Sequence, residues 1–181
     1  MKILGFIFEE KPSVAAHVNY CIKKFNRSLW SLTHLKRAKI EKTTLLEAYK
    51  IMLLPLLEYC SPIYSSMLTC DLSNKLERQQ ATALKIIYSF NYSYADLLSI
   101  AGIPRLEERR QAACDSFINS LVQSDRFSHL FPLNEYPEEM VNLRRTKKYQ
   151  ELHARTTRLF NSPLYYMRRR LNELTETTSI K

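Results

Sequence analysis

The chain has 181 residues, a formal net charge of +9 at pH 7 and a sequence pI of about 9.4. Its hydrophobic fraction of 45% is typical of a folded globular chain and excludes a fully disordered one. Two glycines are too few for a sheet of tight hairpins, so we expect one mainly α-helical domain, or one with an appendage. The cationic excess favours an acidic partner, either nucleic acid or an anionic membrane surface.

The cysteines and histidines are scattered along the chain. The four cysteines stand at positions 21, 60, 70 and 114, and no pair has the two-residue gap of a zinc knuckle. We therefore predict no metal site, no cofactor and free thiols. No secretory signal opens the sequence, so we expect an intracellular protein, nuclear or cytoplasmic, that is not secreted. The longest strongly apolar run, residues 51–57, is far too short to span a bilayer, and no membrane partner is predicted.

Residues 2–9 (KILGFIFE) contain the only clear strand pattern in the sequence. A single strand would be exposed, folded back or paired with another molecule. A long helix is then predicted from Pro12, with Phe25 and Trp30 expected in its core-facing side. Its apolar face is expected to comprise Val14, Val18, Cys21, Ile22, Phe25, Leu29, Leu32 and Leu35. The cations near the end of this helix are explained at least as well by a favourable interaction with the helix dipole as by contact with a phosphate.

Residues 44–60 predict a second helix. Thr44 and Glu47 match a capping box, and the segment that follows has a broad apolar face that includes Met52. Pro55 predicts a kink, because proline lacks the N–H that a helix interior requires, and Pro62 predicts a helix end at positions 60–61. Glu58 has no second carboxylate nearby in sequence. An ion pair with the next helix, for example with Arg78, is therefore favoured over acid–base chemistry.

The third predicted helix carries the first candidate binding residues. Thr69 or Asp71 is expected to cap it, and its apolar stripe comprises Leu72, Leu76, Ala83 and Ile87. At about 100° per residue, three cations fall on the opposite side. We predict that these cations, Lys75, Arg78 and Lys85, contact nucleic-acid phosphates.

Two further helices are predicted before position 124. Residues 93–102 read as a short helix with Ser93 at its start and Gly102 at its end. Tyr94-Ala95-Asp96 matches three residues of the polymerase active-site motif. That motif requires a second, adjacent aspartate to hold two metal ions, and Leu97 stands there instead, so no catalytic role is expected. Pro104 suits the first position of the fifth helix. The inward residues predicted for that helix are Leu106, Ala113, Phe117 and Leu121.

The segment 125–181 reads as a linker followed by a basic, aromatic-rich tail. Between positions 144 and 170 nine cations face one anion, Glu151, which leaves +8, nearly all of the chain's excess. Tyr149, Phe160, Tyr165 and Tyr166 lie among them, and cations beside rings suit the binding of a nucleic-acid strand. A solvated basic tail that acts as a nuclear-import signal is the alternative. The predicted phosphate contacts are Arg144, Arg145, Lys147, Lys148, Arg155, Arg158, Arg168, Arg169 and Arg170.

Several segments resemble one protein family, in the same order along the chain. LLPLLEYCSPIY (53–64) followed by SNKLERQQATALKII (73–87) is similar to the region just downstream of the catalytic palm in reverse transcriptases of non-LTR (LINE-like) retrotransposons. Residues 4–7 resemble the short strand that closes that palm. Residues 102–110, 155–163 and 171–172 fit the later part of the same pattern.

The resemblance implies a division of the chain into three parts: a strand remnant of the palm edge (1–10), a helical thumb-like bundle (11–124) and a linker with a basic tail (125–181). It also implies that this region cradles the template–primer duplex of RNA or DNA. The palm, the fingers and the paired catalytic aspartates are absent, so the chain alone is expected not to polymerise. The sequence thus predicts a bundle of about five helices that binds nucleic acid through phosphates. The alternatives are a protein-interaction module that docks a missing palm or associates with itself, and a relic without function.

Overall fold

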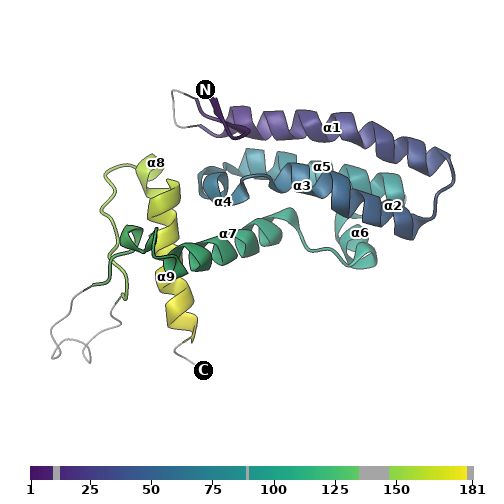
Figure 1. The fold of residues 1–181 in the computed structure, drawn as a ribbon. Coiled ribbons are helices and arrows are strands. Elements are labelled where there is room, and N and C mark those ends of the chain that lie inside the picture. Colours follow the sequence, from purple (N-terminus) through teal and green to yellow (C-terminus); the bar gives the residue numbers. More distant parts are fainter. Residues whose placement is uncertain (10–12, 89, 135–146, 179–181) are drawn as a thin grey trace.

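The computed structural model describes residues 1–9, 13–88, 90–134 and 147–178, and it is mainly helical, as predicted. The long helices are α1 (Ala15–Arg37), α5 (Cys70–Ile87), α7 (Leu106–Gln123) and α9 (Pro163–Thr178). The shorter ones are α2 (Lys42–Ala48), α3 (Leu54–Glu58), α4 (Ser61–Tyr64), α6 (Tyr94–Ala101) and α8 (Thr157–Phe160). Figure 1 shows α3 and α5 between α1 and α7, with α9 crossing one end of α7.

The amino-terminal segment folds back on itself as a hairpin of β1 (Lys2–Ile3) and β2 (Phe6–Ile7). Of the three alternatives for this segment, the folded-back one is confirmed, although the segment forms two short strands where one was predicted. Leu4 and Gly5 form the turn with φ of 46° and 85°, and positive φ at both central positions matches the twist of a tight hairpin. A Cβ at Gly5 would lie 2.9 Å from the hydroxyl oxygen of Tyr59, so close approach also requires glycine there.

Helix α1 packs mainly against α5 and α3. It begins at Ala15, three residues after the predicted start, and buries Val18, Phe25 and Leu32 as the apolar periodicity indicates. The prediction that Trp30 lies in the core was wrong, because its side chain is 65% exposed. The Trp30 ring packs instead against His34, one turn along the helix surface, with 3.7 Å between the ring centroids.

The second predicted helix is interrupted. Helix α2 begins at Lys42 with Glu41 at its N-cap, so the proposed capping box at Thr44 was wrong. The irregularity predicted from Pro55 takes the form of a π-helical segment, Tyr49–Leu53, directly before α3. Met52 is 56% exposed, against expectation. The chain leaves α3 at Tyr59, within two residues of the predicted end.

Helices α5 and α6 agree with their sequence signals. Thr69 caps α5 by accepting a hydrogen bond from the Leu72 N–H at 3.3 Å, and the predicted apolar stripe of α5 is buried. Ser93 and Asp96 form a reciprocal capping box at the start of α6, which gives Asp96 a structural role. Gly102 ends α6 in the left-handed region with φ of 61°.

A buried carboxylate from α5 supports the start of α7. Glu77 is 7% exposed and accepts hydrogen bonds from the N–H groups of Glu107 at 2.8 Å and Leu106 at 3.4 Å, and from the Tyr94 hydroxyl at 2.5 Å. A negative charge there satisfies orphan donors and complements the helix dipole. Helix α7 has no side-chain cap of its own, so Glu77 supplies one from another helix.

Glu58 pairs with Arg109 of α7, and the proposed partner Arg78 was wrong. Arg109 donates from both Nε and Nη2 to the two carboxylate oxygens, the second contact measuring 3.1 Å. The apolar phase predicted for α7 was also partly wrong, since Ala113 and Phe117 are exposed. The buried positions of α7 are Leu106, Arg110, Cys114 and Ile118.

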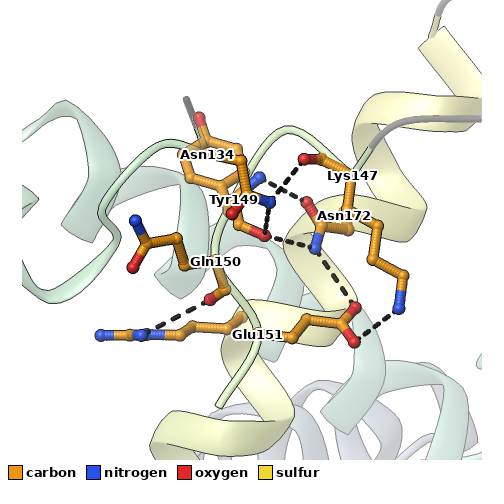
Figure 2. Close-up of polar contacts among 7 residues, drawn as sticks. Asn134, Lys147, Tyr149, Gln150, Glu151 and Asn172 are labelled. Atoms are coloured by element: carbon orange, nitrogen blue, oxygen red, sulfur yellow. Dashed lines mark hydrogen bonds and ion pairs between the residues drawn. The ribbon is translucent and has the colours of Figure 1, made fainter. Parts of the chain in front are cut away.

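The carboxyl-terminal part has a core of its own, where the sequence predicted a linker and a basic, partly irregular tail. This smaller core consists of Ile118, Phe131, Tyr149, Met167 and Leu171. Asn172 of α9 holds the backbone of Tyr149 in place: its Oδ1 accepts from the Tyr149 N–H at 2.9 Å and its Nδ2 donates to the Tyr149 carbonyl at 3.0 Å (Figure 2). The larger core lies among α1, α3, α5 and α6 and includes Phe25, Tyr49, Leu57, Leu76, Leu97 and Leu106.

Candidate nucleic-acid interface

The solvent face of α5 carries the first group of predicted contacts. Lys75 and Arg78 are exposed and form no ion pair within the described part of the chain, whereas Lys85 is half-buried. Beyond Lys85, Lys36 of α1 donates a hydrogen bond to the carbonyl of Ile86. Asp71 is also exposed in the first turn of α5 and reduces the positive potential at that end.

The predicted cations between 144 and 158 lie in different settings. Arg144 and Arg145 fall outside the described residues. Lys147 pairs with Glu151 at 2.6 Å, which leaves less of its charge for a phosphate (Figure 2). Lys148, Arg155 and Arg158 are exposed, and the structure gives them no ion pair with any described residue.

The three consecutive arginines of α9 are engaged inside the molecule. Arg168 is buried and donates from Nε to the Leu130 carbonyl at 2.8 Å. Arg169 lies over the Phe160 ring, 3.2 Å from its centroid. Arg170 forms a bidentate pair with Asp115 of α7, with contacts of 2.8 and 2.9 Å. These guanidinium groups make contacts that hold the carboxyl-terminal part together. The phosphate contacts expected from the sequence for these three arginines stay a prediction.

The aromatic rings of this segment are also used internally. Tyr149 is buried in the smaller core, and Tyr166 donates its hydroxyl hydrogen bond to Gln111 at 2.7 Å. Phe160 is covered on one face by Arg169. Tyr149 is therefore not available to stack on a base, whereas Phe160 remains 48% exposed.

Arg158 is brought to the start of α5, far away in sequence. It lines a cavity of about 270 Å³ together with Ser13 of the segment before α1, Thr69 and Leu72 of the α5 start, and Asn161. Lys75 follows Leu72 by one helical turn, and residues at that spacing are neighbours on a helix surface. The structure thus places one cation of the tail beside the cationic helix that the sequence singled out.

A cysteine thiol and a histidine imidazole, the side chains of a nucleophile and its base, lie close together on α1. The Sγ of Cys21 lies 3.5 Å from the Nε2 of His17, and both side chains are buried. Burial raises the pKa of Cys21 to about 11 and lowers the pKa of His17. Both groups therefore remain neutral at pH 7, and the thiolate that such chemistry requires is not formed.

Among the described residues, no three His, Cys, Asp or Glu side chains gather in a way that could hold a metal ion. Of the helices in the described ranges, none combines the length and the apolar character needed to cross a bilayer. Comparison of the chain with protein-family models, curated proteins and solved structures finds no match.

Proposed function

We propose that the chain binds nucleic acid through backbone phosphates, as the thumb-like part of a non-LTR retrotransposon reverse transcriptase. The observation that carries the proposal is the exposure of Lys75 and Arg78 on α5, which form no ion pair with any described residue. Arg158 lies near the start of the same helix. The resemblance of residues 53–64 and 73–87 to that family supports it. The chain alone is proposed not to polymerise, because the paired aspartates that hold two metal ions are missing from its sequence.

Phosphate contacts of this kind give affinity without sequence readout, because they release counterions from the nucleic-acid backbone. Binding of a fluorescent RNA–DNA hybrid should therefore weaken as salt rises, with little dependence on base sequence. Removing two phosphate-contacting cations should lower the slope of log affinity against log salt by about 2. The test variant is Lys75→Ala/Arg78→Ala, measured by fluorescence anisotropy at several salt concentrations.

The matched control is Lys23→Ala/Arg27→Ala, which removes the same charge from exposed positions of α1. We expect this control to keep the wild-type slope. A salt-independent affinity, or equal slopes for the two double variants, would refute the proposed interface.

A second candidate function is that of an α-helical protein-interaction module. The observation that favours it is the exposure of two adjacent apolar side chains, Ile51 at 71% and Met52 at 56%, in the π-helical segment. This function predicts self-association or a protein partner with an affinity that is indifferent to salt. Light scattering of the wild type and of Ile51→Ser/Met52→Ser would detect the self-associating case as a loss of mass in the variant.

A further inference from the structure

A small cavity lies where the start of α5 meets α7. Its volume is about 190 Å³. It is separate from the Arg158 cavity, although Thr69 borders both. The lining residues used below are Ser65, Thr69, Cys70, Ser73, Glu107 and Arg110.

Arg110 is the unusual member of this lining. Its side chain is only 3% exposed, and it forms no ion pair within the described residues. Its Nη2 donates to the Ser73 hydroxyl at 2.9 Å, whereas its Nη1 is buried without a hydrogen-bond partner. A guanidinium cannot lose its proton in a protein, so this positive charge is buried without an ion-pair partner among the described residues. Burial of a charge in that state is costly unless an anion completes the site.

The other wall of the cavity is the amino end of α5, an 18-residue helix. Thr69 accepts from the Leu72 N–H, and the positive end of the helix dipole, which Asp71 in the first turn partly offsets, borders the same region. The hydroxyls of Ser65 and Ser73 are also in the lining, although both already donate or accept one hydrogen bond. A helix start and a buried arginine with a free donor form the combination that binds phosphate groups.

We propose that this cavity binds a single phosphate group, held by Arg110 and the first turn of α5. The identification of its source rests on the proposed function: if the chain binds nucleic acid, the group is a backbone or terminal phosphate of the strand. If the chain does not bind nucleic acid, the group is a free phosphate or a small phosphate ester. Glu107, exposed and also in the lining, opposes an anion and limits the affinity.

Cys70 provides a local reporter for occupancy. It is the exposed cysteine and lines this cavity, whereas Cys21 and Cys114 are buried and Cys60 is half-buried. The alkylation rate of Cys70, followed by peptide mass spectrometry of the full chain, should fall when phosphate occupies the cavity. At a phosphate concentration of about four times Kd, the rate falls about fivefold if the occupied form is unreactive. Chloride at equal ionic strength is the salt control.

Three variants separate this site from a general salt effect. Arg110→Met keeps a long buried side chain and removes the charge, and Ser73→Ala removes the hydroxyl that orients the guanidinium. Both should reduce or abolish the protection of Cys70 by phosphate, and Ser73→Ala keeps the test possible if Arg110→Met does not fold. Glu107→Gln should strengthen the protection. Absence of protection in the wild type, or equal protection in Arg110→Met, overturns the proposal.

A second arm uses a short 5′-phosphorylated oligonucleotide in place of phosphate. Protection of Cys70 that depends on Arg110 identifies the strand as the source of the phosphate. Protection by phosphate without any binding of the oligonucleotide supports the cavity and refutes the proposed function. Oligonucleotide binding that depends on Lys75 and Arg78, with no phosphate effect at Cys70, supports the proposed function and overturns the cavity.

Discussion

Replacement of Glu77 is the most direct test of how this bundle is held together. In the native structure its carboxylate accepts hydrogen bonds from the Tyr94 hydroxyl and from two N–H groups at the start of α7. Glu77→Ala removes the acceptor of all three donors, of which the Leu106 N–H is buried. Hydrogen bonds to a charged group contribute about 1.5–3 kcal/mol each, and a charge at a helix start about 0.3–1 kcal/mol. Since the contact with Leu106 is long and such values do not add fully, we expect a loss of about 3–4 kcal/mol.

Two milder replacements test which contacts of Glu77 account for this loss of stability. Glu77→Gln keeps one acceptor oxygen and loses the charge, so we expect a loss of about 1–2 kcal/mol. Tyr94→Phe removes one donor and leaves the contacts to α7, with an expected loss of about 1–1.5 kcal/mol. The matched control is Glu108→Gln, an exposed acid in the same first turn of α7, which should lose less than about 0.5 kcal/mol.

Urea unfolding followed by circular dichroism at constant pH measures all four variants. If Glu77→Ala costs no more than Glu108→Gln, the carboxylate does not support α7 and the reasoning is wrong. If Glu77→Gln costs as much as Glu77→Ala, the negative charge is responsible for the whole effect, because glutamine keeps the shape of the side chain and one acceptor oxygen.

Three further predictions concern single contacts. The guanidinium of Arg170 lowers the pKa of Asp115, so the pair stabilises the fold above the ordinary aspartate pKa, and this stability is lost as pH falls through the lower native pKa. Urea titrations should show wild type to be more stable than Asp115→Asn by about 1–2 kcal/mol at pH 7, and this difference should shrink below about pH 4. Asn172→Leu should accelerate hydrogen exchange of the Tyr149 amide, with a local loss of about 2 kcal/mol, whereas an unchanged rate would contradict the role of the amide clamp. Gly5→Ala should destabilise the fold by about 1 kcal/mol and lower its thermal midpoint, because φ at Gly5 is positive and Tyr59 lies where the added Cβ would be. An unchanged midpoint in calorimetry would show that the turn accommodates a Cβ and would contradict the prediction.

The sequence predicted those elements whose local signals and packing agree. The apolar stripe of α5 is spaced at Leu72, Leu76, Ala83 and Ile87, and every member of it is buried. The limits of α6 were also predicted, because a serine cap and a left-handed glycine act over a few residues.

Other elements were mispredicted where charged side chains occupy buried positions. The buried side of α7 runs through Arg110 and Cys114, so a search for apolar periodicity chose Ala113 and Phe117 instead. Arg110 follows Leu106 and precedes Cys114 at four-residue intervals, and that spacing was an available signal for its burial. Helix α9 was not predicted, because its apolar residues Met167 and Leu171 have helical spacing but are separated by three consecutive arginines. The partners of such groups come from distant parts of the chain, as Asp115 does for Arg170, and local sequence does not identify them.

Helix α7 contributes Leu106 to the larger core and Ile118 to the smaller one, so a single rod anchors both clusters. The smaller cluster contains few side chains, and units of that size open at lower free energy than the rest of a domain. Fraying from the carboxyl end would therefore withdraw Arg158 from the start of α5 and leave Lys75 and Arg78 in position. If the proposed interface is right, a nucleic-acid strand that contacts both Arg158 and the α5 cations would oppose this local opening.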